Sequence, residues 1–212
     1  ACLQNALSMI SGPGAYSLTL PTGSGKTLAG LIIANALIKK FDYKSLIYTL
    51  PFISIVEQTS QNTVEIYTED CIQEDHSQIS FSGKDSENPW QRMTEMFRYW
   101  YKPVILTTLA QLWDAIFSPT ANRSMNFHRL NRAVVILDEP QTIPTAYWSG
   151  FAAALNLLSK KLGTIFILMT ATQPQIIERE QKNLELSPQP YHFPKIRHTY
   201  KTIQINEPIE ID

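Results

Sequence analysis

The sequence has little excess charge of either sign. Its 18 Lys and Arg residues nearly balance 19 Asp and Glu residues, which leaves a formal net charge of −1. This balance excludes a strongly basic domain that holds nucleic acid by general electrostatic attraction, so any contact with phosphates must be local. Charged residues make up 17% of the chain and hydrophobic residues 44%, a composition that indicates a globular core and argues against disorder.

Cysteines and long hydrophobic runs are also scarce. The two cysteines, Cys2 and Cys71, lack the spacing of a disulfide framework or a zinc site, so we expect free thiols. The longest apolar run, residues 28–38, is far shorter than the roughly 20 residues of a membrane-crossing helix, and no signal-peptide pattern is present. These absences predict a cytoplasmic protein without a membrane partner.

Short β-rich runs alternate with helical runs along most of the chain. The expected strands are residues 16–20, 45–50, 104–107, 133–137 and 164–169. The expected helices between them are residues 27–40, 53–67, 108–117 and 145–162. Strands joined by helical crossovers predict an α/β fold, with a mostly parallel sheet, helices on both faces, and ligands bound beyond the carboxyl ends of the strands.

The pattern suggests one domain over residues 1–185 and a tail over residues 186–212. The chain opens inside a helical pattern, so we expect it to be part of a longer protein. In the tail, Lys195, Arg197 and Lys201 alternate with aromatic residues before an acidic end. We interpret the tail as a linker to a further domain. A basic nucleic-acid-binding arm is the alternative, which these scattered cations support only weakly.

The strongest chemical motif is Pro21-Thr-Gly-Ser-Gly-Lys-Thr27, which lies between an expected strand and an expected helix, as a phosphate-binding loop does. In such loops the glycines let backbone N–H groups wrap the phosphates, the lysine reaches the β and γ phosphates, and the hydroxyl ligates Mg²⁺. Leu20 stands where the general pattern has its first glycine. The predicted nucleotide-binding residues are Thr22, Gly23, Ser24, Gly25, Lys26 and Thr27.

A second motif, Ala133-Val-Val-Ile-Leu-Asp-Glu139, is an apolar strand that ends in adjacent carboxylates. Such carboxylates are often solvated strand ends, but together with the phosphate-binding loop they predict a Walker-B site. Asp138 would hold Mg²⁺ opposite Thr27, and Glu139 would deprotonate the water that attacks the γ-phosphate. With Lys26, these residues predict an enzyme that hydrolyses ATP with the help of Mg²⁺.

Further motifs resemble those of superfamily 2 helicases in order and spacing. Asp138-Glu-Pro-Gln141 resembles their DExH/DExQ box, and Met169-Thr-Ala-Thr-Gln173 resembles motif III. Leu50-Pro-Phe-Ile-Ser-Ile-Val-Glu-Gln58 is similar to motif Ia, and Thr107-Thr-Leu-Ala-Gln111 to the next DNA-contacting motif. With Asp75-His-Ser77, this combination is similar to the type I CRISPR-associated helicase-nuclease family up to about residue 175.

The resemblance implies the first RecA-like motor domain of a DNA-dependent ATPase and 3′-to-5′ helicase that serves CRISPR interference. It places Gln4 on adenine, adds Gln141 to the catalytic residues, and assigns coupling of hydrolysis to movement to Gln141, Thr170 and Thr172. It assigns single-stranded DNA to Pro51, Phe52, Gln58, Thr107 and Thr108. It also implies a second RecA-like domain that closes the ATP site, an HD nuclease domain or subunit, and a CRISPR surveillance complex as partners.

Two features of that family are absent from the sequence. None of the 4 histidines precedes an aspartate, so there is no HD nuclease motif, and no Gln-x-x-Gly-Arg-x-x-Arg motif supplies the arginines of a second motor domain. Two other functions stay open. One is a translocase of a restriction or repair system, which would share every catalytic residue. The other is an ATP-binding interaction module that does not turn over as an isolated chain.

Several further side chains have structural explanations. Helical spacing favours core packing over base stacking for the following residues: Trp90, Met93, Phe97 and Trp100, and also Trp113 and Phe117. His76 lies in a polar segment, where a substrate-facing role and a structural role are equally compatible with the sequence.

Overall fold

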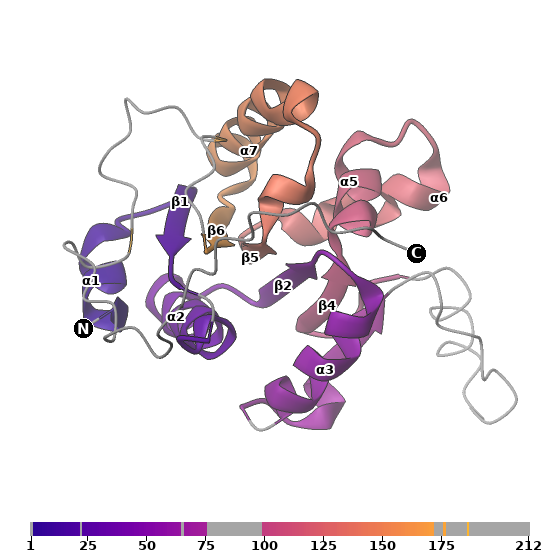
Figure 1. Ribbon diagram of the computed structural model, residues 1–212. Helices are drawn as coiled ribbons and strands as arrows, with labels where there is room; N and C mark the ends of the chain where they lie inside the picture. The colour runs from indigo at the N-terminus through magenta and orange to yellow at the C-terminus, as the bar shows by residue number, and fades with distance from the viewer. Residues whose placement is uncertain are drawn as a thin grey trace, which may run out of the picture.

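The computed structural model describes residues 2–21, 23–64, 66–75, 99–171, 176 and 186 (Figure 1). Several residues singled out from the sequence lie outside this part of the chain, or have side chains that do: Thr22, Gln58, His76, Trp90, Met93, Phe97 and Thr172. Most of the expected linker also lies outside it. Leu186, the first residue of that linker, is buried, and its N–H donates to the carbonyl of Ser17 at 2.7 Å.

All six strands run parallel in one sheet of order β1-β6-β5-β2-β4-β3. The strands are β1 (Gly14–Thr19), β2 (Ser45–Leu50), β3 (Ile72–Asp75), β4 (Val104–Thr108), β5 (Ala133–Asp138) and β6 (Ile165–Thr170). Every residue of β2, β4, β5 and β6 is buried. Burial on both faces explains why these strands form nearly unbroken apolar runs in the sequence.

Helices cover both faces of the sheet (Figure 1). The α-helices are α1 (Cys2–Met9), α2 (Lys26–Phe41), α3 (Ile53–Val64), α5 (Leu109–Phe117), α6 (Ala121–Ser124) and α7 (Trp148–Leu162). Short 3-10 turns are η1 (Glu69–Cys71), η2 (Met125–Leu130), η3 (Pro140–Thr142) and η4 (Thr145–Tyr147). Along β5, Val134 and Ile136 pack with residues of α2 and α3, whereas Val135 and Leu137 pack with residues of α5 and α7. The predicted parallel α/β architecture is confirmed.

The structure differs from the expected elements in places where local sequence is a weak guide. The strand β3 was not predicted, because it has only four residues, lies at the edge of the sheet and is largely polar. The helix expected at residues 145–162 begins only at Trp148, after the turn η4. The helix expected at residues 53–67 ends at Val64.

The aromatic predictions have mixed outcomes. Trp100 is fully buried, as predicted, and its indole Nε1 donates to Asp75 Oδ2 at 2.8 Å. Trp113 packs partly buried against the core, with its ring centroid 5.7 Å from that of Phe151. The core position predicted for Phe117 is wrong, since its side chain is 39% exposed. It lies in the last turn of α5 and covers the Trp113 ring from outside, at 4.4 Å between centroids.

The remaining expectations concern thiols, metals and membranes. Cys71 is a free thiol. In the described ranges, no group of three or more His, Cys, Asp and Glu side chains is arranged to hold a metal ion. Nor does any helix there combine the length and apolar composition needed to cross a bilayer.

One glycine sets how closely α2 approaches the sheet. A Cβ atom at Gly30 would overlap the sulfur of Met169 in β6 and lie 3.1 Å from its Cε. Met169 is fully buried, so its side chain has little room to move away. A Cβ at Gly150 in α7 would meet nothing within 4 Å. An added methyl group would therefore meet a buried side chain at Gly30 and open space at Gly150.

We predict that Gly30→Ala lowers the free energy of unfolding by about 1–2 kcal/mol, because overpacking outweighs the better helix propensity of alanine. Gly150→Ala is the matched control and should raise it by up to about 1 kcal/mol. Urea denaturation followed by circular dichroism measures both. Equal stabilisation by the two substitutions would show that α2 does not pack on Met169 as described.

Candidate functional site

The carboxyl ends of the parallel strands bring the sequence motifs to one edge of the sheet. The loop after β1 carries the glycine-rich motif, and β5 ends at Asp138. The end of β6 carries Thr170, and Pro51 and Phe52 follow β2. This shared edge is where ligands bind in open α/β sheets.

The glycine-rich loop has the backbone that its composition predicts. Gly23 and Gly25 adopt φ angles of 77° and 80°, in the left-handed region that favours glycine. The loop closes on itself, since both the N–H and the hydroxyl of Ser24 donate to the carbonyl of Pro21, at 3.2 and 2.6 Å. α2 then starts at Lys26 without a side-chain cap. Uncapped N–H groups and the helix dipole make this end of α2 suited to an anion.

Lys26 lies between the two carboxylates predicted from the second motif. Its Nζ is 3.0 Å from Asp138 Oδ1 and donates a hydrogen bond to Glu139 Oε1. The side chains are largely removed from water, with 14% of Lys26, 9% of Asp138 and 27% of Glu139 exposed. One cation thus faces two adjacent anions at a partly desolvated site. The structure brings Lys26, Asp138 and Glu139 together as the sequence predicts.

The environment moves the pKa values of the two carboxyl groups in opposite directions. Burial raises the pKa of Asp138 above its ordinary value, although Lys26 acts to lower it. Burial also acts to raise the pKa of Glu139, but hydrogen bonds from Lys26 and Gln141 outweigh it and the pKa is lowered. The pKa of Lys26 is raised, because its carboxylate partners outweigh the effect of burial. Pairs of acids separated in this way are typical of catalytic sites.

Tyr48 belongs to this site although none of the sequence motifs includes it. Its hydroxyl donates to Asp138 Oδ2 at 3.2 Å and also forms a hydrogen bond with the side chain of Thr27. Burial, followed by the charge of Asp138, raises the pKa of Tyr48 well above its ordinary value, so the phenol stays protonated. The available signal was the hydroxyl of Tyr48 within a strand expected to be buried, because a buried hydroxyl needs a hydrogen-bond partner.

The backbone turns sharply at Glu139. This residue has φ 50° and ψ 52°, a left-handed conformation that costs a non-glycine residue about 1–2 kcal/mol. Its N–H donates to the carbonyl of Met169 at 2.8 Å, and its carboxylate accepts a hydrogen bond from the backbone of Ala171. Gln141 Nε2 donates to Glu139 Oε2. These contacts hold the Glu139 carboxylate and connect it to the end of β6.

The other predicted residues occupy varied positions. Gln4 is exposed on α1, which packs against α2. Phe52 is 62% exposed just beyond β2. Thr107 is buried, and its hydroxyl donates to the carbonyl of Asp75 at 2.7 Å, so that hydroxyl is engaged within the sheet. The Thr108 hydroxyl accepts from Gln111 N at 3.4 Å and caps α5.

Comparison with known proteins identifies the family. The model of the DEAD/DEAH box helicase family matches residues 3–179. The chain belongs to this family. Among curated relatives, it is 31% identical over 188 residues to the CRISPR-associated nuclease/helicase Cas3 of Haloferax volcanii, a match that covers 78% of the chain and 20% of that relative.

Solved helicase structures share the fold. The T. fusca Cas3 structure with ADP matches with a TM-score of 0.62 and 22% identity, covering 81% of this chain and 21% of that one. The Pyrococcus furiosus Hef helicase domain matches with a TM-score of 0.53 and 17% identity, covering 86% of this chain and 36% of that one. The chain therefore has a RecA-like helicase fold, and it spans about a fifth of the length of the Cas3 relatives.

We predict that Lys26→Ala destabilises the nucleotide-free protein in a pH-dependent way. At neutral pH the free energy of unfolding should fall by about 1–3 kcal/mol, because two partly buried carboxylates lose their counter-ion. Without Lys26 the folded-state pKa values of Asp138 and Glu139 rise. A carboxyl group whose pKa is higher in the folded state than in the unfolded state destabilises the fold while it is ionised. The decrease in the free energy of unfolding caused by Lys26→Ala should therefore become smaller as the pH falls from about 7 to 5, because protonation removes the repulsion between the two carboxylates.

Urea denaturation at the two pH values measures the effect. Lys39→Ala is the control, because Lys39 is an exposed lysine in the last turn of α2. It should lower the free energy of unfolding only slightly at both pH values. A loss for Lys26→Ala that is equal at both pH values would mean that the carboxylates do not depend on this lysine.

Proposed function

We propose that this chain is the first motor domain of an ATP-dependent DNA helicase that acts in CRISPR interference. The observation that carries the proposal is the contact of Lys26 with both Asp138 and Glu139 next to an uncapped helix start. This arrangement suits phosphoryl transfer, which needs positive charge on the phosphates and a base for the attacking water. Membership of the DEAD/DEAH box helicase family and similarity to Cas3 support it.

The nucleotide would bind at the loop after β1. Backbone N–H groups of Gly23 and Gly25 would surround the phosphates, and the Ser24 N–H would exchange the Pro21 carbonyl for a phosphate oxygen. Lys26 would exchange its carboxylate partners for the β and γ phosphates. Gln4 on α1 would contact the adenine. Structures of T. fusca Cas3 with ADP and with ATP support a nucleotide as the ligand.

A divalent metal fits the residues present. The side chains of Thr27 and Asp138 both hydrogen-bond to Tyr48, so two oxygen ligands of the kind that Mg²⁺ prefers lie close to one hydroxyl. Bound Mg²⁺ would neutralise charge on the phosphates. Glu139, whose lowered pKa keeps it ionised at neutral pH, would accept the proton of the attacking water. Tyr48 would hold the Asp138 carboxylate in place.

Coupling of hydrolysis to movement would pass through the end of β6. The carbonyl of Thr170 accepts from Leu20 N at 3.1 Å, and the backbone of Ala171 bonds to the Glu139 carboxylate. A change in the hydrogen bonds of Glu139 during hydrolysis would therefore be passed on to the glycine-rich loop after β1 and to the segment that contains Thr172. Gln141, which bonds to Glu139 on its other side, would take part in the same coupling.

Single-stranded DNA would follow the edge beyond β2 and β4. The exposed ring of Phe52 and the neighbouring Pro51 are available for nucleotide contacts, with Gln58 farther along α3. At Thr107 and Thr108 the hydroxyls already bond to the protein. A second RecA-like domain would close the ATP site, and an HD nuclease domain or subunit and a CRISPR surveillance complex would be the partners. We expect this assembly in the cytoplasm.

A translocase of a restriction or repair system is the second candidate, since helicases such as Hef share the fold. The 31% identity to a curated Cas3 favours the CRISPR assignment. An ATP-binding module without turnover fits less well, because the site retains the carboxylate that would serve as the base.

We predict that Lys26→Ala in the full-length protein lowers DNA-stimulated ATP turnover by about 100-fold or more, because the phosphates lose their cation in the transition state. Steady-state ATPase with single-stranded DNA is the measurement. Lys39→Ala should keep normal turnover. Near-normal turnover of Lys26→Ala would show that ATP is not hydrolysed at this site.

Glu139→Gln should separate binding from hydrolysis. The amide keeps the size of the side chain but cannot accept the proton of the attacking water, so turnover should fall while the Kd for ATP changes little. Fluorescent nucleotide binding and single-turnover hydrolysis give the two values. Loss of ATP affinity together with turnover would instead assign Glu139 to holding the metal.

A further inference from the structure

Cations gather at the amino edge of the sheet, opposite the candidate ATP site. They lie where the chain enters the strands: Lys39, Lys40 and Lys44 before β2, Lys102 before β4, Arg129 and Arg132 before β5, and Lys160 and Lys161 before β6. Lys26 lies at the other edge, beside Asp138 and Glu139. Within the described part of the chain, basic side chains are therefore concentrated at this edge, although the formal net charge is −1.

Part of this pattern has a local explanation. Lysines in the last turns of α2 and α7 complement the negative ends of the helix dipoles. Lys40 also donates to the carbonyls of Leu7 and Ile10, both at 2.7 Å. Neither explanation covers Lys44, Arg129 and Arg132, which are not in the last turn of an α-helix and form no ion pair within the described part of the chain.

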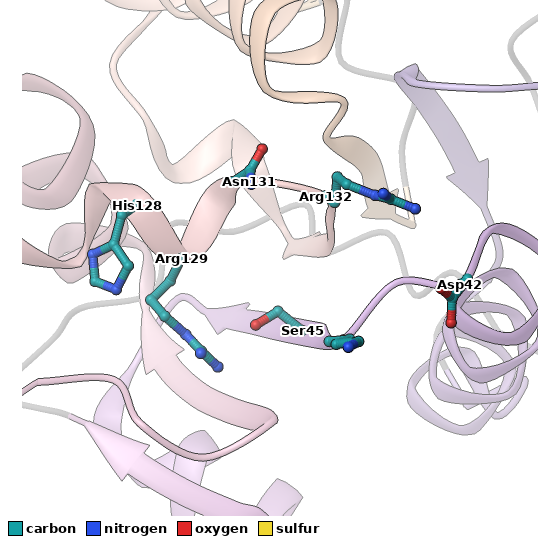
Figure 2. A pocket seen from close by; sticks show the side chains of 7 residues that line it. Asp42, Ser45, His128, Arg129, Asn131 and Arg132 are labelled. Atoms are coloured by element: carbon teal, nitrogen blue, oxygen red, sulfur yellow. The ribbon is translucent and has the colours of Figure 1, made fainter.

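These three cations line one hollow of about 320 Å³. Figure 2 shows that its walls come from two segments, the connection from α2 to β2 with Asp42 and Ser45, and the segment before β5 with the remaining labelled residues. The complete lining is Asp42, Lys44, Ser45, His128, Arg129, Asn131 and Arg132. Three formal positive charges thus face one negative charge, and hydroxyl, amide and imidazole groups can add hydrogen bonds.

Arg129 has a donor that lacks an acceptor among the described residues. Its Nη2 donates to the carbonyl of Lys102 at 2.7 Å, which fixes the guanidinium. Its Nε is buried, and no described residue accepts a hydrogen bond from it. A buried donor without an acceptor is costly, and an oxyanion is the acceptor that a guanidinium fork fits best.

Arg132 is held at the same hollow by an unusual backbone. Its φ is 48°, a left-handed conformation that arginine rarely adopts, and its N–H donates to the carbonyl of Leu162 at 2.8 Å. Its Nη2 donates to the carbonyl of Phe41 at 3.3 Å, and its guanidinium lies 5.8 Å from the ring centroid of Tyr43. The second cation is therefore positioned by several contacts.

An aromatic pair adjoins the cations. The rings of Tyr99 and His128 stack with centroids 5.2 Å apart and an interplanar angle of 15°. Tyr99 Oη also lies 2.8 Å from His128 Nε2. Guanidinium groups next to a planar aromatic surface suit a chain that carries both phosphates and bases, whereas an acidic peptide would use only the charges.

We propose that this hollow binds a phosphodiester group of a nucleic-acid strand, as a contact separate from the one beyond β2 and β4. The proposal rests on the proposed function, because it assumes that the protein engages DNA. Arg132 precedes β5 and Asp138 ends it. The same separation holds along β2, where Ser45 lines the hollow and Pro51 follows the last residue, Leu50. At about 3.3 Å per residue the hollow and the contact beyond β2 lie about 20 Å apart, so one strand of DNA could reach both.

The test measures DNA affinity of the full-length protein by fluorescence anisotropy, with a labelled single-stranded oligothymidylate over a series of salt concentrations. Lys44→Glu changes an exposed side chain and should preserve the fold. It should weaken binding about fivefold or more. The plot of log affinity against log salt should become less steep, by about 0.7 for each phosphate that the protein no longer neutralises.

Arg129→Lys keeps the charge but removes the forked guanidinium, and it should also weaken DNA binding. ATP turnover without DNA should stay unchanged in both.

Lys160→Glu is the matched control, since it reverses an exposed charge near the same edge but outside the hollow. Its affinity should stay within about twofold of the wild type, because isolated surface charges act weakly in salt. Equal decreases in affinity for Lys44→Glu and Lys160→Glu, or unchanged binding by Lys44→Glu and Arg129→Lys, would overturn the proposal. A wild-type protein that hydrolyses no ATP and binds no DNA would instead overturn the proposed function itself.

Discussion

The contact of Lys26 with two adjacent carboxylates is the interaction on which the candidate site depends. Lys26 begins α2 after β1, whereas Asp138 and Glu139 lie at the end of β5, more than a hundred residues later. They meet because β6 pairs in parallel with both β1 and β5, so that the ends of all three strands share one edge. At this depth the two carboxylates would repel each other strongly without a cation. The sheet order, the loop and the start of α2 must therefore all be correct for the charges to balance.

The Lys26 contact also links parts of the site that have separate roles. Glu139 receives hydrogen bonds from Lys26, from Gln141 and from the backbone of Ala171, and its left-handed backbone is held by Met169. Tyr48 holds Asp138 through the carboxylate oxygen that Lys26 does not contact. Asp138 and Glu139 thus each have further groups that orient them, which is the arrangement expected of a preorganised site.

The sequence alone predicted the features that depend on local pattern. Buried parallel strands are largely apolar, so β2, β4, β5 and β6 could be located. The loop and the Asp138-Glu139 pair lie within short motifs. Features that depend on distant residues were missed. Tyr48 acquires its role from a strand partner, and the short polar β3 exists because β4 pairs with it. Phe117 matches a core pattern, but it falls where α5 ends. The cations at the amino edge are scattered in sequence and converge only through the topology.

The basic side chains at the amino edge give that part of the described surface a local positive potential, although the formal net charge of the chain is −1. A nearly neutral body with such a local potential feels little force at long range but a torque near a charged surface. Near a polyanion it would turn its amino edge forward before contact, leaving the opposite edge free.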